Sequence, residues 1–110
     1  MARTPPEMLQ GTVDILILRA LAWEPMHGYA IASWLDERSS GVLAVNGAAL
    51  YQALHRLEHH GWVAATWGRS ENGRKAKYYE LTAAGKTQLR SVTAVWRRYA
   101  DAVSTVLNPA

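Results

Sequence analysis

Hydrophobic positions at the start of the chain predict a helix from Leu9 to Trp23 that is apolar almost all round. A helix without a clean polar face is buried on more than one side. Because the chain is short, we expect the second side to be covered by another subunit. Pro25 ends this segment. Pro5 and Pro6 disfavour regular structure before it, so residues 1–8 are expected to form a flexible arm.

A second helix is predicted to start near Gly28. Ile31 and Leu35 lie four residues apart, which places both on one face, toward the core. The segment SSG at residues 39–41 breaks this helix. Residues 42–45 (VLAV) are then expected to form a short extended link, and an edge strand is an alternative interpretation.

The third predicted helix lies within AALYQALHRLEHHGW, residues 48–62, and its two faces differ. Leu50, Leu54 and Leu57 follow the spacing i, i+4, i+7 and form one apolar stripe. The other face carries hydrogen-bond donors, acceptors and aromatic rings, with few acids. Its residues are Tyr51, Gln52, His55, Arg56 and His59.

Capping residues mark where the helices begin and end. Asn46 is a good N-cap for the third helix, and Gly61 stands where a C′ glycine belongs. Thr82 is expected to cap a last helix that starts at about Ala83.

A β-hairpin is predicted between the third and last helices. Its strands are WVAATWG at 62–68 and KAKYYEL at 75–81, joined through an Asn72-Gly73 turn signal. Three helices followed by a hairpin and a helix form a winged helix-turn-helix. The predicted fold is therefore mainly α with a small β-hairpin (α+β), followed by a C-terminal dimerisation helix.

The last helix has an apolar seam with the spacing 3, 4, 3, 4, 3, which is the a/d heptad pattern of paired helices. Together with the first helix it predicts a homodimer, although packing of both helices only within their own domain is the alternative. The expected interface comprises Leu9, Val13, Ile17, Leu89, Val92, Trp96, Tyr99, Val103 and Val106. The predicted divisions are the arm at 1–8, the winged helix-turn-helix domain at 9–82 and the dimerisation helix at 83–107.

Composition restricts the function classes. The 110 residues fit one domain, and the absence of cysteine excludes disulfides and thiolate metal sites. The N-terminus does not resemble a signal peptide, and no apolar run reaches about 18 residues, so we expect a cytoplasmic protein without a membrane span. Residues 56–98 hold nine Lys and Arg against three acids, a charge of +6, which leaves −3 for the rest. This asymmetry favours a polyanionic partner, and a solvated surface is the alternative.

The polar face of the third helix has the chemistry that a DNA major groove requires. Gln52 can pair with adenine, and Arg56 with guanine or a phosphate. On the hairpin, basic residues flank the small tip, which can follow the DNA backbone or enter the minor groove. The basic residues are Arg69, Arg74, Lys75 and Lys77.

Over roughly residues 8–107 the sequence resembles small PadR-like transcriptional regulators. The motifs are HGY at the second helix, LYQALHRLEHHGW in the third, and GRKAKYYELTAAG across the hairpin. The resemblance implies a dimeric, DNA-binding repressor in which Tyr29 and Tyr51 reach phosphates and Lys77 anchors the wing. The full set of expected DNA-binding residues is Tyr29, Asn46, Ala49, Tyr51, Gln52, His55, Arg56, Arg69, Asn72, Gly73, Arg74, Lys75 and Lys77.

The chain departs from the family pattern at the start of the third helix. Family members usually carry Gly and then Ser or Thr before Leu-Tyr, and Pro after it, where this chain has Ala48, Ala49 and Gln52. The lost hydroxyl removes one DNA contact that the resemblance implies, and Gln52 adds a potential adenine reader. We expect either an altered DNA site or weakened DNA binding.

A metal site, an enzyme active site and a ligand cleft are the other kinds of site to consider in this sequence. His55 and His59 lie four residues apart beside His60, but no third ligand is placed by the sequence, so neither a metal nor another cofactor is expected. No nucleophile, base and oxyanion donors group together, which argues against an enzyme. Trp96 and Tyr99 either pack in the dimer seam or form one wall of a cleft for a flat, apolar effector. A winged helix that binds protein rather than DNA is the remaining alternative.

Overall fold

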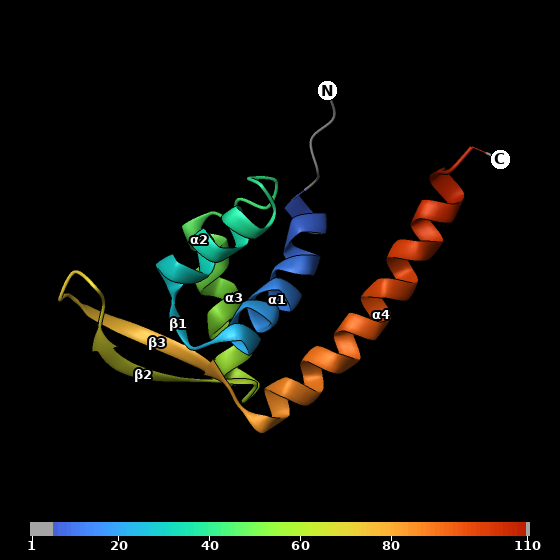
Figure 1. Cartoon of the computed structure of the whole chain (residues 1–110). Helices are drawn as coiled ribbons and strands as arrows, with labels where there is room; N and C mark the ends of the chain where they lie inside the picture. Colours follow the sequence, from blue (N-terminus) through green and yellow to red (C-terminus); the bar gives the residue numbers. More distant parts are fainter. Residues whose placement is uncertain (1–5, 110) are drawn as a thin grey trace.

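A computed structural model describes the backbone of residues 6–109 and the side chains of residues 12–109. Within them lie four helices and one three-stranded sheet, so the α+β class predicted from the sequence is confirmed (Figure 1). In chain order the elements are α1 Pro6–Trp23, β1 Met26–His27, α2 Gly28–Arg38, α3 Gly47–His59, β2 Val63–Arg69, β3 Lys75–Leu81 and α4 Ala83–Leu107.

Helix α1 begins at Pro6, so the prediction of a flexible arm is wrong for residues 6–8. Proline is tolerated at the first helical position because the amide hydrogen that it lacks has no partner in the helix there. Residues 1–5 lie outside the described part of the chain.

The helix caps follow local chemistry. The side chain of Asn46 accepts a hydrogen bond from the Ala49 amide at 2.8 Å, and Thr82 Oγ1 accepts one from the Gly85 amide at 3.0 Å. Both predicted N-caps are thus confirmed. Gly61 has a φ of 77° just after α3, the left-handed conformation expected of a C′ glycine.

Helix α1 lies at the centre of the molecule, in contact with α2, α3, α4 and β3 of its own chain. The apolar side chains of α1 that are buried between Val13 and Leu21 are therefore covered by neighbouring elements of the same protomer. Val13 is only 3% exposed and Ile17 0%, so predicting them as dimer-interface residues was wrong: one protomer already buries both. The side chain of Leu9, predicted for the same interface, lies outside the described residues.

The sheet is antiparallel, with the order β1-β3-β2. Strands β2 and β3 are the predicted hairpin, in register from Val63 opposite Leu81 to Arg69 opposite Lys75. We call β2, the connecting loop 70–74 and β3 the wing. Strand β1 was not predicted, and the alternative of an edge strand at 42–45 is wrong, because that segment has no strand pairing.

Helix α4 divides into two parts. Leu89 and Val92 in its first half pack against the core, next to α1. The second half leans away from the rest of the chain, as Figure 1 shows. Its seam residues are exposed, up to 81% at Val106. They are Trp96, Tyr99, Val103 and Val106.

Candidate nucleic-acid interface

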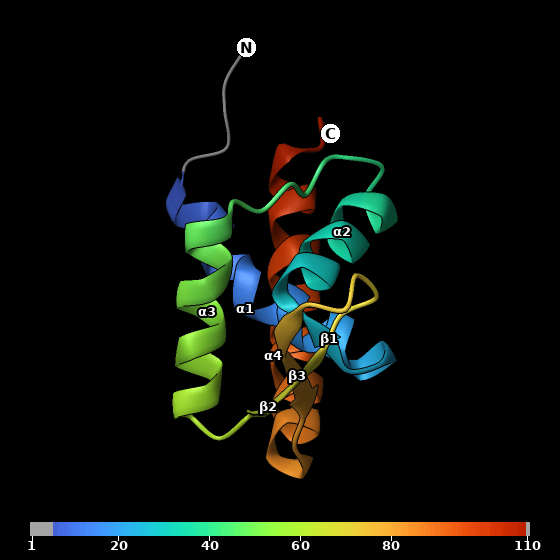
Figure 2. The ribbon, with the colours of Figure 1, turned by 90° about the vertical axis from the view of Figure 1, so that its left-hand side faces the viewer.

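The outer face of α3 is a solvent-exposed polar surface. Leu50, Leu54 and Leu57 are buried, which turns the opposite side of the helix outward. Figure 2 shows α3 at one edge of the molecule, with the wing at the front. We call the outer residues the reading face, and they line a shallow hollow of about 650 Å³. The reading face consists of Ala48, Tyr51, Gln52, His55 and Arg56.

A second hollow, of about 490 Å³, lies between the wing and the starts of α2 and α3. Its lining combines aromatic rings with ammonium groups, both of which suit a nucleic-acid backbone. Three residues named by the family resemblance line it: Tyr29 and Tyr51, which it implies reach phosphates, and Lys77, which it implies anchors the wing. Trp67 and Lys75 of the wing also line it, with the Lys75 ammonium 4.9 Å from the centre of the Trp67 ring. The exposed Trp67 was not predicted as a site residue.

Gly28 allows α2 and α3 to approach each other at this hollow. A Cβ atom at Gly28 would lie 2.5 Å from the hydroxyl oxygen of Tyr51, which is closer than real contacts allow. The absence of a side chain at the start of α2 therefore lets the Tyr51 ring lie against it. The position of Tyr51, and so of one edge of the reading face, depends on this glycine.

The wing tip is held by hydrogen bonds within the hairpin. The Gly73 amide donates to the Ser70 carbonyl, and the Ser70 amide donates to the Arg74 carbonyl, both at 2.8 Å. Gly73 has a φ of 75°, so the predicted Asn72-Gly73 turn signal corresponds to a real turn. Arg69 Nη1 donates to the Gly73 carbonyl at 2.9 Å. Its guanidinium is thus partly engaged by the tip itself rather than free for a ligand.

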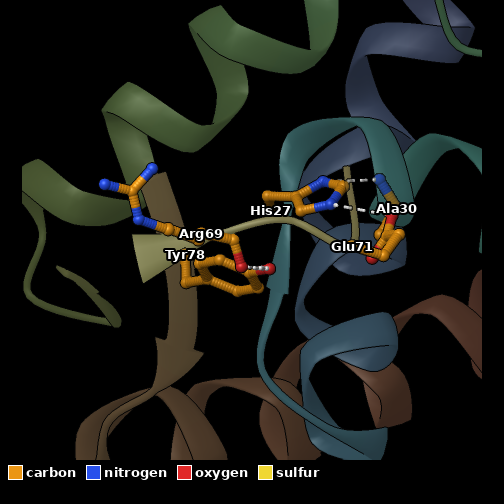
Figure 3. Close-up of polar contacts among 5 residues, drawn as sticks. All are labelled: His27, Ala30, Arg69, Glu71 and Tyr78. Carbon is orange, nitrogen blue, oxygen red and sulfur yellow. Dashed lines mark hydrogen bonds and ion pairs between the residues drawn. The ribbon is translucent and has the colours of Figure 1, made fainter. Parts of the chain in front are cut away.

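His27 connects the start of α2 to this tip, as Figure 3 shows. Its Nδ1 accepts a hydrogen bond from the Ala30 amide at 3.1 Å, which caps α2. A neutral imidazole that accepts at Nδ1 carries its proton on Nε2. That nitrogen lies 3.6 Å from Glu71 Oε1 in the wing loop. Tyr78, whose hydroxyl donates to the Arg69 carbonyl at 2.9 Å, packs edge-on against the His27 ring.

Two cations that were predicted to contact DNA are already paired with carboxylates. Arg56 Nη2 donates to Asp14 Oδ1 of α1 at 2.8 Å. Lys77 Nζ lies 3.4 Å from Oε1 of Glu58, a partly exposed residue of α3. Neither pair was predicted, since the partners are 42 and 19 residues apart and no local pattern relates them.

Residues 17–91 match the model of the transcriptional regulator PadR-like family. The chain belongs to this family. A protein from Lysinibacillus sphaericus is 30% identical over 90 residues, which make up 82% of this chain and 83% of that protein. A solved structure of a PadR family transcriptional regulator from Eggerthella lenta is similar at 32% identity, with a TM-score of 0.78 over 94% of this chain and 88% of that one. A transcriptional regulator from Clostridium thermocellum, 22% identical, shares the fold, with a TM-score of 0.85 over 96% of this chain and all of that one.

The sequence predicted departures from the family pattern at Ala48, Ala49 and Gln52, which lie in the first two turns of α3. Because Asn46 caps the Ala49 amide, the helix does not need a hydroxyl at position 48 or 49 for this purpose. Gln52 is exposed on the reading face, as its place in the pattern predicted. In this PadR-like chain, the start of α3 is therefore capped by Asn46, and Gln52 is among the groups that the helix presents to solvent.

His59 ends α3 in this PadR-like protein, and His60 follows it as the C-cap residue. His60 stacks on Trp62 at 4.4 Å between ring centroids, while its ring is 6.0 Å from that of His59. Within the described part of the chain, no three His, Asp or Glu side chains come together as metal ligands would.

None of the helices described is both long and apolar enough to cross a membrane.

Tyr79 of β3 is the titratable group of the site with a perturbed proton affinity. Burial raises the pKa of its hydroxyl above the ordinary value, an effect that the positive charge of Lys77 opposes. The Lys77 ammonium lies 5.6 Å from the centre of the Tyr79 ring. The sequence offered no signal for this perturbation, because it depends on the strand pairing that buries Tyr79.

Proposed function

We propose that this PadR-like protein is a sequence-specific regulator that binds double-stranded DNA as a homodimer. The observation that carries the proposal is the exposed reading face of α3, which lies beside a hollow lined by wing cations and tyrosines. A major groove admits one α-helix, and base edges there are read by hydrogen-bonding side chains. Since its target is chromosomal DNA, we place the protein in the cytoplasm.

In the proposed complex α3 lies in the major groove and the wing follows the backbone. Gln52 and Arg56 carry the side chains suited to adenine and guanine, respectively. Lys75 and Lys77 face the hollow that Tyr29 and Tyr51 share, where a phosphate chain can pass. The wing tip, with Asn72, Gly73 and Arg74, extends toward the adjacent minor groove.

The proposed dimer uses the second half of α4. A row of exposed apolar residues at heptad spacing is unfavourable in water and is typical of a helix that pairs with another. The seam from Trp96 to Val106 is such a row. Two copies related by a two-fold axis would present two reading faces, so the proposed operator is palindromic.

The proposed mode of regulation is repression, released by a small, flat, apolar effector. Trp96 and Tyr99 lie 5.8 Å apart between ring centroids, on the seam that the second subunit would cover. Aromatic walls of this kind bind planar ligands. A ligand held between the subunits could change the spacing of the two reading faces and thereby lower operator affinity.

The second candidate function is a winged helix that binds a protein partner. It is favoured by the pairing of Arg56 and Lys77 with carboxylates, which reduces the positive charge available to DNA. The loss of the hydroxyl at the start of α3 points the same way.

The two functions are distinguished by selecting the fragments that the protein binds from the genomic DNA of its own organism and sequencing them. Enrichment of a common palindromic site supports the regulator. Fragments without a shared site contradict sequence-specific binding and favour the protein-binding alternative.

A further inference from the structure

Asp14 on α1 contacts the reading face although it belongs to a different helix. Helices α1 and α3 pack against each other (Figure 1), which brings Asp14 within 2.8 Å of Arg56 Nη2. The pair is half-exposed, with 47% of the Arg56 side chain and 34% of the Asp14 side chain accessible. It therefore lies at the margin of the surface that would meet DNA and not in the core.

We propose that Asp14 is a positioning residue that sets the sequence discrimination of this protein through Arg56. By holding the guanidinium in a pair without net charge, Asp14 favours contacts of Arg56 with base edges over contacts with phosphates. This inference rests on the proposed DNA-binding function and deepens it, because it assigns a specificity role to a residue outside α3 and the wing.

The first part of the argument concerns hydrogen bonds. The contact with Asp14 is made by Nη2 alone, so it occupies one of several N–H donors of the guanidinium. The other donors stay available for the O6 and N7 atoms of a guanine. Arg56 lines the same hollow as Gln52 and His55, and 47% of its side chain is accessible, so a ligand on the reading face can reach it.

The second part concerns charge. When unpaired cations of a protein bind phosphates, most of the binding free energy comes from the counterions that leave the DNA. Because every DNA sequence offers phosphates, this free energy does not depend on sequence. An arginine beside a carboxylate has little net charge to contribute to that release. An arginine without its carboxylate would bind any phosphate within reach. This would strengthen binding to all DNA sequences and lower the preference for the operator.

The pair between Lys77 and Glu58 is a matched control. Its members are exposed to a similar degree, 38% and 37%, and, like the first pair, it joins a residue of α3 to a residue of another element. Lys77 belongs to the wing, where we place contacts with the backbone rather than with bases. Releasing Lys77 from Glu58 should therefore strengthen binding to all DNA alike. Both carboxylates are half-exposed, and ion pairs of this kind contribute little to folding.

The experiment compares the affinity for the selected operator with that for a scrambled duplex of the same length and base composition. Fluorescence anisotropy is measured for the wild type, Asp14→Asn, Asp14→Glu, Glu58→Gln, Arg56→Ala and the Asp14→Asn/Arg56→Ala double variant. Asp14→Asn should bind the scrambled duplex more tightly, and its ratio of operator to scrambled affinity should fall about threefold to tenfold. Asp14→Glu, which restores a carboxylate, should recover most of the wild-type ratio. Glu58→Gln should tighten both complexes and leave the ratio unchanged.

The Arg56→Ala background separates action through Arg56 from a general effect of charge. There, Asp14→Asn should leave the ratio unchanged, because no guanidinium remains to be positioned. The inference is overturned if Asp14→Asn keeps the wild-type ratio of operator to scrambled affinity. It is also overturned if Asp14→Asn lowers this ratio equally with and without Arg56. In both cases the regulator proposal stands. Wild-type protein that shows no preference for any duplex overturns the proposed function and this inference together. Thermal unfolding of each variant checks the fold, and Asp14→Ser is the second carboxylate-free variant for the same comparison.

Discussion

At the scale of single residues, the candidate interface depends on contacts between side chains that are distant in the sequence. Tyr51 lies against Gly28, Arg56 pairs with Asp14, and Glu71 approaches His27. The sequence pattern identified most of the outward-facing groups of α3, because helical periodicity alone separates its two faces. It could not identify their partners, since these lie on other elements and are brought close only by the tertiary fold.

Gly28→Ala should weaken DNA binding without unfolding the protein. The added methyl group would overlap the hydroxyl end of Tyr51, which can swing away because it is the far end of a flexible side chain. Loss of one positioned phosphate contact should lower affinity several-fold. Gly47→Ala is the control, since a Cβ there meets no atom within 4 Å. Anisotropy titration on one duplex measures both, and equal affinities would show that the place of Tyr51 does not matter.

Tyr79→Phe should alter the dependence of stability on alkaline pH. Burial raises the pKa of Tyr79 in the folded state, so unfolding releases a proton once the pH exceeds the unfolded value of about 10. The contribution of this group is therefore constant below that pH and is lost as the pH rises toward the folded pKa. Urea unfolding at increasing pH should show a smaller loss in the Phe variant. Parallel curves for the two proteins would contradict the assigned burial effect.

At the scale of elements, caps and periodicity account for what the sequence predicted. Helices α2, α3 and α4 and the wing follow from apolar spacing, from Asn46 and Thr82, and from the turn at Gly73. Strand β1 was missed because two residues carry no periodicity, and their pairing with β3 is a contact across some fifty positions. The start of α1 at Pro6 was not predicted, because proline disfavours most helical positions but is tolerated in the first turn.

Asn46 offers a test of the first turn of α3. Asn46→Ala should lower the free energy of unfolding by about 1 kcal/mol, because the Ala49 amide loses its acceptor. Asn46→Asp should keep the cap and its stability, since Asp also accepts this hydrogen bond. The added negative charge beside the proposed DNA surface should nevertheless weaken binding to duplex DNA. Chemical denaturation and anisotropy together measure the two effects. Equal stability of the Ala variant and the wild type would mean that the cap contributes nothing.

At the scale of the whole molecule, the two halves of α4 have different surroundings. The first half is part of the core, and Gly85 lies so close to the Trp62 carbonyl that a Cβ atom there would clash with it. The second half exposes an apolar seam. The heptad spacing predicted the seam but could not show where burial by the same chain stops. The all-round apolar pattern of the first helix assigned Val13 and Ile17 to a second subunit, although their own chain buries them.

Val103→Asp should convert the proposed dimer into monomers. The substitution places a charge in the middle of the seam, where pairing of two copies would bury it without a partner. Ser104→Asp is the control, because it adds the same charge one position off the seam. Sedimentation equilibrium should give the monomer mass for the first variant and the dimer mass for the second. A dimer that survives Val103→Asp would refute this interface.

The salt dependence of DNA binding tests the central claim most directly. Affinity for the selected fragment is measured by anisotropy at several salt concentrations. A dimer that neutralises about six to ten phosphates should give a slope of log affinity against log salt of about −5 to −9. That result would establish that the dimer contacts about as many phosphates as two reading faces and two wings are expected to reach. Weak binding with a shallow slope would contradict the regulator proposal and would redirect the search to protein partners of the reading face.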